Sequence, residues 1–217
     1  MSDCLIIIPC YNEEERLPIK QFENFINLLT NSNIHLLFVN DGSLDNTQLV
    51  IDSLVNKNKE ILFSIHKNKN EGKAAAIKTG SDWALEHSYQ WIAYFDADLS
   101  APLNEIFPML KLKEDKTHLK FILGSRVKRL GTEIERSNVR HYFGRVFSTL
   151  ASLVLKLPVY DTQCGAKLLH RDLIEIAFKE KFISKWIFDV EIIARIIKAK
   201  GKEYAINHLY EYPLQEW

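Results

Sequence analysis

The stretch Trp91-Ile92-Ala93-Tyr94-Phe95-Asp96-Ala97-Asp98 joins an apolar run directly to two carboxylates. Residues 91–95 are typical of a buried strand, and a strand with this ending delivers acidic oxygens to the edge of a sheet. Carboxylate oxygens are ligands that Mg²⁺ and Mn²⁺ prefer. The triplet alone does not decide between a metal site and a solvated turn, so its meaning depends on the rest of the chain.

Short apolar runs alternate with segments of helical length through the first half of the chain. The runs predict strands at residues 5–8, 36–39, 61–65, 91–95 and 121–123. The segments between them predict helices at residues 19–30, 45–56, 72–87 and 103–113. This alternation is typical of an α/β protein with a mostly parallel sheet flanked by helices. In the second half we expect helices at 138–157 and 186–199, a turn and short strand at 161–170, and a strand at 204–209.

Length and composition are those of a single globular domain. The chain has 217 residues, of which 47% are hydrophobic, enough for one sizeable core. Basic and acidic residues number 28 each, which argues against nucleic-acid binding through bulk electrostatics. Three cysteines without paired spacing favour a reducing compartment. The first residues carry no basic signal segment, and the stretch 146–159 is shorter than the ~18 residues of a membrane span, so we expect a cytoplasmic protein, soluble or peripheral to the membrane.

Polar clusters follow the first four predicted strands. They occupy residues 9–13, 40–43, 68–73 and 96–98. In parallel sheets, ligands bind outside the carboxyl ends of the strands, so we expect these clusters to face one rim. Loops are polar in any case, but three of the four clusters place a carboxylate within a few residues of the strand, which favours a ligand site.

Two residues in these clusters suit particular parts of a nucleotide. Asp41 ends the second strand and, as an acceptor-only group, could receive the N–H of a nucleobase. The surrounding segment is equally consistent with helix capping alone, with Asp45 as the N-cap. Lys73, near the start of the third helix, could contact a phosphate or pyrophosphate, and a solvated lysine is the alternative. The sequence around it is not a Walker loop.

Basic residues after the fifth strand could bind a second anion. Arg126 could pair with a phosphate in bidentate fashion, and a surface arginine is the alternative. Four basic residues gather around the start of the helix at 138–157, whose remainder is apolar: Arg136, Arg140, His141 and Arg145. That helix fits an interfacial element that meets anionic lipid headgroups, and equally a core helix with a solvated end.

Taken in chain order, these motifs resemble those of the family 2 inverting glycosyltransferases of the GT-A fold. The motifs that carry the resemblance lie at residues 6–13, 40–47, 70–73, 96–98 and 124–126. Two further segments, 161–168 and 186–191, resemble the dolichyl- or polyprenyl-phosphate β-glucosyltransferases and, less closely, their mannosyl equivalents. The similarity spans about residues 5–217, and although each motif is weak, seven in order are specific.

The resemblance implies one Rossmann-like GT-A domain over residues 1–217, with 1–126 binding a nucleotide sugar and 127–217 the acceptor. It implies Asp96 and Asp98 beside a divalent cation, Mg²⁺ or Mn²⁺, that neutralises a diphosphate. UDP-glucose is the favoured donor because Ser100 stands where mannosyl members usually carry glutamine. The residues expected to contact the nucleotide sugar are Pro9, Tyr11, Asn12, Glu13, Asp41, Lys73, Asp96 and Ala97.

The acceptor implied by the resemblance is a polyprenyl or dolichyl phosphate at the inner face of the membrane. A lipid phosphate is already an anion, so it needs little base catalysis, and Arg126 and Arg140 would position it. A sugar hydroxyl, as in surface polysaccharide synthesis, is the alternative acceptor and would need a base. Asp189, in an apolar context, is the candidate base, with a structural or donor-sugar-binding role as its alternative. GDP-mannose is the alternative donor.

Two other classes of protein fit the sequence less well. A sugar-phosphate nucleotidyltransferase would need a glycine-rich, basic loop after the first strand, where this chain has Glu13-Glu14-Glu15. A non-catalytic protein that binds nucleotide sugars would have no need of both Asp96 and Asp98.

Overall fold

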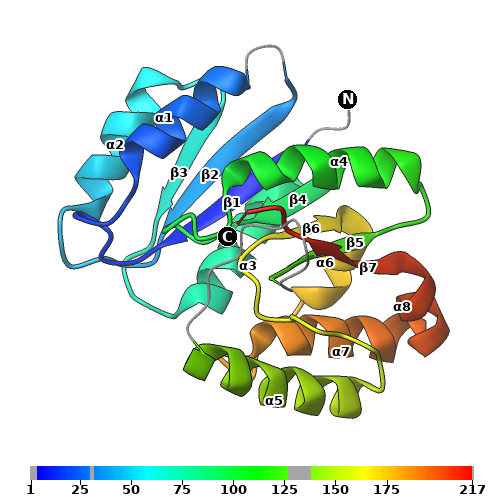
Figure 1. Ribbon diagram of the computed structural model, residues 1–217. Helices are drawn as coiled ribbons and strands as arrows, with labels where there is room; N and C mark the ends of the chain where they lie inside the picture. Colours follow the sequence, from blue (N-terminus) through cyan, green and yellow to red (C-terminus); the bar gives the residue numbers. More distant parts are fainter. Residues whose placement is uncertain (1–3, 30–31, 127–137, 217) are drawn as a thin grey trace.

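The computed structural model describes residues 4–29, 32–126 and 138–216, and for residues 138–146 it describes the backbone alone. This part of the chain forms a seven-stranded sheet with the strand order β3-β2-β1-β4-β6-β5-β7 (Figure 1). Only β6 is antiparallel to its neighbours, so the carboxyl ends of the other strands meet at one edge. The strands are β1 (Cys4–Cys10), β2 (Ile34–Asn40), β3 (Leu62–His66), β4 (Trp91–Tyr94), β5 (Phe121–Ser125), β6 (Lys167–His170) and β7 (Leu209–Pro213).

Helices cover both faces of the sheet, which explains why β1 is apolar at successive positions. Ile6 and Ile8 enter the core beneath α1, α2 and α4, whereas Leu5 and Ile7 enter the core beneath α3, α6 and α7. Figure 1 shows the two helical layers, with α5 lying beside α7. The helices are α1 (Ile19–Leu28), α2 (Thr47–Lys57), α3 (Lys73–Glu86), α4 (Ile106–Asp115), α5 (Asn138–Leu155), α6 (Arg171–Ala177), α7 (Phe188–Lys200) and α8 (Lys202–His208), with a 3₁₀ turn at Leu103–Glu105.

The predicted α/β architecture is confirmed, and the five strands and four helices of the first half are present with small shifts at their ends. Thr30, the predicted end of the first helix, lies outside the described residues. The strand predicted at residues 204–209 is wrong, because Lys202–His208 is helix α8 and β7 begins at Leu209. Tyr204 stacks on His208 with ring centroids 3.9 Å apart, a contact between residues one helical turn apart.

The described residues contain no helix that combines the length and the apolar character needed to cross a membrane. Cys4, Cys10 and Cys164 are all buried and none of them forms a disulfide, in agreement with their unpaired spacing in the sequence.

Candidate active site

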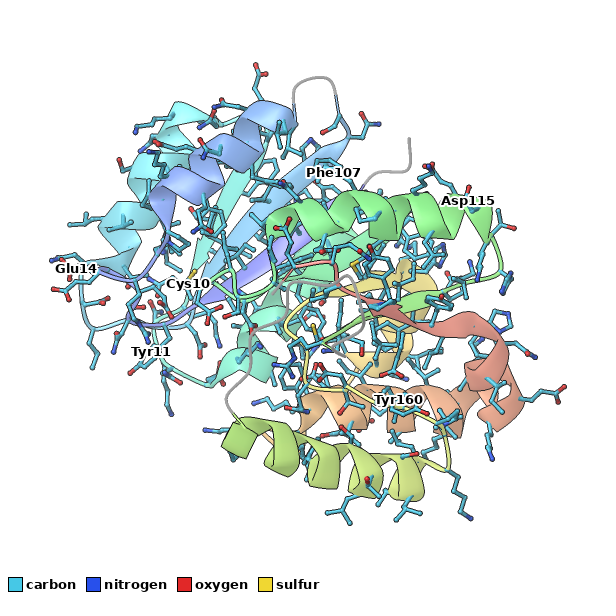
Figure 2. All side chains as sticks on the ribbon, viewed as in Figure 1. Cys10, Tyr11, Glu14, Phe107, Asp115 and Tyr160 are labelled. Carbon is cyan, nitrogen blue, oxygen red and sulfur yellow. The ribbon has the colours of Figure 1, made fainter. Side chains whose placement is uncertain are left out.

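A cleft of about 390 Å³ opens at the carboxyl edge of the sheet. Residues from all four predicted polar clusters line it, so the expectation that these clusters share one rim is confirmed. Figure 2 labels Cys10, Tyr11 and Glu14, which lie at this end of β1. The lining includes these residues that the sequence singled out: Pro9, Tyr11, Glu13, Asp41, Lys73, Asp96, Ala97 and Asp98.

The loop after β1 is joined to the loop after β2 by a series of hydrogen bonds. The Asn12 N–H donates to Ser43 Oγ at 2.9 Å, and the Glu13 N–H donates to Thr47 Oγ1 at 2.7 Å. In return, the Leu44 N–H donates to Asn12 Oδ1 at 2.9 Å. Asn12 has a left-handed backbone (φ 53°), which asparagine tolerates better than most residues. The Asn12 side chain thus holds this loop pair, and Asn12 itself does not line the cleft.

Asp45 ties the same loops to helix α2. Its Oδ1 accepts from the Thr47 N–H at 3.0 Å and from Thr47 Oγ1 at 2.5 Å. The N-cap residue of α2 is Asn46, so the prediction of Asp45 as the N-cap is wrong by one position. Burial acts to raise the pKa of Asp45, but its hydrogen bonds outweigh that effect and lower the pKa.

Asp41 is 2% exposed and holds the loop that follows β3. Its Oδ2 accepts from the Gly72 N–H at 2.6 Å and from the Glu71 N–H at 3.1 Å, while Oδ1 accepts from Lys67 Nζ at 2.5 Å. Asp41 therefore places the first turn of α3 at the cleft. Because each carboxylate oxygen accepts two hydrogen bonds, Oδ1 retains capacity for a ligand N–H.

Lys73, the first residue of α3, forms an ion pair with Asp96 in the cleft. Burial acts to lower the pKa of Lys73, but the carboxylates of Asp96 and Asp189 raise it by more, so the side chain is held as a cation. Its side chain is 37% exposed and lines the cleft.

Asp96 and Asp98 both reach the cleft from the turn after β4. The Leu99 N–H donates to the Asp96 carbonyl at 3.0 Å and the Ser100 N–H donates to Asp98 Oδ1 at 3.0 Å, which holds the turn. Among the described residues no cluster of three or more histidine, cysteine or acidic side chains forms a ready metal site. Diphosphate oxygens and water would therefore complete the coordination of a cation, and this all-oxygen set suits Mg²⁺ or Mn²⁺. The two carboxylates fit a cation that binds together with a nucleotide.

Arg126 pairs with Asp161 rather than lining the cleft. The Arg126 guanidinium donates from Nε to Asp161 Oδ2 and from Nη2 to Asp161 Oδ1, each at 2.7 Å. The backbone N–H of Arg126 also donates to Oδ2, at 2.9 Å. Burial acts to lower the pKa of Arg126, and Asp161 raises it by more. Arg140 lies in the first turn of α5, but its side chain is outside the described residues, as is the whole of Arg136.

Asp189 lies behind the cleft, in the first turn of α7, and is 3% exposed. Its Oδ1 accepts from the Tyr94 hydroxyl at 2.6 Å and lies 2.9 Å from Lys167 Nζ. The sequence did not predict a role at the site for Tyr94 or Lys167. The available signal was a lysine in the apolar run Ala166-Lys167-Leu168-Leu169.

The arrangement of the sheet and the acidic cleft at its carboxyl edge define a GT-A glycosyltransferase fold. Glucosyl-3-phosphoglycerate synthase from Mycobacterium tuberculosis, solved in complex with Mn²⁺, UDP and phosphoglyceric acid, superimposes with a TM-score of 0.70 at 14% identity, over 98% of this chain and 68% of that one. Mannosyl-3-phosphoglycerate synthase from Rubrobacter xylanophilus gives a TM-score of 0.71 at 13% identity, over 100% and 67%.

The chain belongs to glycosyl transferase family 2, whose model matches residues 5–177. It is 31% identical over 218 residues to a dolichyl-phosphate beta-glucosyltransferase of Trichomonas vaginalis, covering 93% of this chain and 64% of the relative. It is 29% identical over 212 residues to the enzyme of that name from Saccharomyces cerevisiae, covering 90% and 63%. Polyprenol monophosphomannose synthase of Mycolicibacterium smegmatis is 27% identical over 196 residues, with 89% and 71% covered. The chain thus spans slightly less than two thirds of the two glucosyltransferases.

Proposed function

We propose that this chain transfers a hexose from a nucleotide sugar to a polyprenyl or dolichyl phosphate, with inversion at the anomeric carbon, and that UDP-glucose is the donor. The observation that carries the proposal is one cleft lined by Asp41, Lys73, Asp96 and Asp98, at the sheet edge where α/β proteins bind ligands. The names of the two glucosyltransferase relatives support the glucosyl donor and the lipid phosphate acceptor.

In this proposal each part of the cleft has a task in donor binding. Pro9, Tyr11, Glu13 and Asp41 hold the nucleoside, and the Lys73 ammonium contacts the diphosphate. Asp96 and Asp98 hold Mg²⁺ or Mn²⁺, which would neutralise charge that develops on the leaving diphosphate. The Mn²⁺ and UDP bound to a protein of the same fold support this assignment. Lys73 and Asp96 pair with each other in this structure. When the diphosphate binds with its cation, Lys73 would pair with the diphosphate and Asp96 with the cation.

The acceptor phosphate enters as an anion and attacks from the face opposite the leaving group. Arg126, at the end of the nucleotide-sugar half, and Arg140, in the acceptor half, would position it. With a sugar hydroxyl instead, a base would be needed, and Asp189 keeps that role in the alternative reaction.

We also propose that the protein contacts the membrane peripherally, at its cytoplasmic face. Leu150, Leu153 and Val154 form an exposed apolar face on α5. In the segment before α7, Ile183 is 95% exposed and Trp186 is 84% exposed. Apolar and aromatic side chains beside exposed lysines suit the boundary of an anionic lipid surface, and this segment carries Lys181 and Lys185.

A transfer assay with a panel of donors and acceptors tests the proposal. UDP-glucose, UDP-galactose and GDP-mannose would be offered with polyprenyl phosphate or with free sugars, with and without Mn²⁺. We expect Mn²⁺-dependent transfer from UDP-glucose to the lipid phosphate. Transfer only from GDP-mannose would contradict UDP-glucose as the donor. Transfer only to a sugar hydroxyl would contradict a lipid phosphate as the acceptor. Thermal unfolding with each nucleotide gives an independent measure of donor binding.

A further inference from the structure

Lys167 is fully buried at the first position of β6. Its Nζ lies 2.9 Å from Asp189 Oδ1 and donates to the carbonyl oxygen of Cys164 at 2.5 Å. The ammonium also lies 5.3 Å from the centre of the Tyr94 ring, and the Tyr94 hydroxyl donates to the same Asp189 oxygen. We call Tyr94, Lys167 and Asp189 the buried triad. It joins three side chains that donor binding and transfer to a lipid phosphate, as proposed above, do not require.

The buried triad connects β4, β6 and α7 directly behind the cleft. Tyr94 ends β4 and stands opposite Lys167 in antiparallel register, and Asp189 lies in the first turn of α7. Asp96 follows Tyr94 by two residues, and Gly165 precedes Lys167 by two. Asp96 and Gly165 then meet again, because a Cβ on Gly165 would lie 2.6 Å from Asp96 Cγ. The triad therefore sits next to both segments that form this contact.

The contribution of the Lys167–Asp189 ion pair to stability does not by itself explain why these two charges are buried. Removing two charges from water often costs more than their attraction returns, and apolar residues of similar volume are often as stable. Metal ligands, by contrast, depend on the groups behind them for orientation, and losing such a group typically weakens metal affinity about 10- to 100-fold. The contact of Asp96 with Gly165 is where the triad can exert such an effect.

We propose that the buried triad positions the Asp96 carboxylate for the cation that binds with the nucleotide, with Lys167 as the central positioning residue. The chain of contacts runs from Asp189 to Lys167, from Lys167 to the Cys164 carbonyl, and from that turn to Gly165, against which Asp96 rests. This inference rests on the proposed function, since it presupposes a cation-dependent nucleotide site. It assigns Asp189 a positioning task in place of the base.

Calorimetric binding of UDP and GDP, each with and without Mn²⁺, tests the inference together with thermal unfolding. The main variant is Lys167→Met combined with Asp189→Leu, which removes both charges and leaves neither one buried alone. We expect a folded protein that is less stable than the wild type, because the Tyr94 hydroxyl and the Cys164 carbonyl lose these hydrogen-bond partners. Its nucleotide affinity in Mn²⁺ should fall about tenfold or more, while the affinity without metal stays unchanged. A purely structural triad would lower the unfolding temperature and leave the Mn²⁺-supported affinity unchanged.

Lys113→Met is the matched control. Lys113 is also a buried lysine, and its Nζ lies 5.5 Å from the centre of the Trp91 ring, at the opposite end of β4 from Asp96. This variant should lose stability and keep the Mn²⁺-supported affinity of the wild type. Tyr94→Phe is the milder test if the double variant does not fold, because it removes only the hydroxyl hydrogen bond. We expect it to lower the Mn²⁺-supported affinity about threefold, again without an effect on metal-free binding.

Two results would overturn the inference, and the first of them would leave the proposed function intact. One is an unchanged Mn²⁺-supported affinity in the folded double variant, or in Tyr94→Phe should the double variant not fold. The other is an Asp189→Asn variant that loses turnover but binds Mn²⁺ and nucleotide normally, which would make Asp189 a base. If the wild type itself binds neither UDP nor GDP in Mn²⁺, the proposed function fails and the inference fails with it.

Discussion

Gly165 lies directly against the carboxylate of Asp96, and the contact leaves no space for a side chain between them. A Cβ on Gly165 would lie 2.6 Å from Asp96 Cγ, whereas Cβ atoms in proteins essentially never approach another heavy atom closer than 3.0 Å. The glycine is therefore required by its neighbour, and not by its own backbone conformation. The position of one candidate metal ligand depends on the absence of a side chain in a segment 69 residues further along the chain.

Replacing Gly165 by alanine should damage catalysis more than folding. The new methyl group must push the Asp96 carboxylate aside, and a displacement of about 1 Å at a reacting site can cost about 100-fold in rate. Overpacking of this kind costs about 1–3 kcal/mol of stability. We therefore expect the rate of Mn²⁺-dependent transfer to fall about tenfold or more. Steady-state kinetics and thermal unfolding measure the two effects.

Gly201→Ala is the control for the Gly165 variant. Gly201 has a left-handed backbone (φ 89°), but a Cβ there would have nothing within 4 Å. Alanine at this position should cost about 1–2 kcal/mol of stability through backbone strain and leave turnover unchanged. Full activity in Gly165→Ala would show that Asp96 does not need its present position.

Lys73→Gln should weaken donor binding with little effect on folding. Lys73 is proposed to bind the diphosphate, and a hydrogen bond to a charged group contributes about 1.5–3 kcal/mol. The KM for the nucleotide sugar should therefore rise about tenfold or more, while the KM for the acceptor stays the same. Initial-rate measurements with each substrate varied in turn separate the two constants.

Lys78→Gln supplies the comparison on the same helix. Lys78 pairs with Asp82 at 2.9 Å on the exposed side of α3, so its loss should change neither KM. An unchanged donor KM in Lys73→Gln would remove Lys73 from the proposed donor site.

Glu13→Gln should stabilise the free protein at neutral pH. Burial raises the pKa of Glu13, Arg16 opposes that shift, and the carboxylates of Asp98 and Asp45 add to it. Because folding raises this pKa, the native state disfavours the ionised form. The charge on Glu13 therefore reduces stability above the folded pKa, and this penalty is absent below the unfolded value of about 4.3.

Unfolding temperatures of Glu13→Gln and the wild type, measured from neutral pH down to about pH 4, test this linkage. The variant should be the more stable at pH 7, and the difference should shrink as the pH falls and Glu13 becomes protonated. A difference that does not depend on pH would mean that the charge of Glu13 is not the cause. Glu14→Gln, which removes the charge of the neighbouring acid, is the comparison.

The part of the site built by β1, β2 and β4 could be predicted from the sequence because each piece is local. An apolar run followed by Pro9–Glu13 or by Asp96 and Asp98 fixes both a strand and the edge to which it points. Two other contacts could not be predicted from the sequence, because their partners lie far apart in the chain. Arg126 and Asp161 are 35 positions apart, and Tyr94 and Asp189 are 95 positions apart. Those pairs depend on where β6 inserts into the sheet, and its antiparallel position between β4 and β5 leaves no periodic signal.

The sequence does not distinguish helix α8 from a strand, because the spacing of Tyr204, Ile206 and Leu209 fits both structures. Burial is more informative, since only Ala205 of α8 is buried. The exposed face of α5 was also undetermined, because an apolar helix can be covered by protein or by lipid. Ala151 and Leu155 face the protein, whereas Leu150, Leu153 and Val154 do not.

Serine at positions 183 and 186 should weaken membrane binding while leaving donor binding intact. Ile183 and Trp186 are exposed side chains that would enter the lipid boundary, and burying each large apolar side chain contributes about 1.5–3 kcal/mol. The combined variant Ile183→Ser and Trp186→Ser should lower binding to vesicles containing anionic lipid by about tenfold or more. Co-sedimentation with such vesicles measures the effect, and UDP binding in solution provides the internal control. Leu49→Ser removes an exposed leucine from α2, in the helical layer on the other face of the sheet, and should leave vesicle binding unchanged. If the double variant bound vesicles as the wild type does, the segment before α7 would not be the membrane contact, and α5 would become the next surface to test.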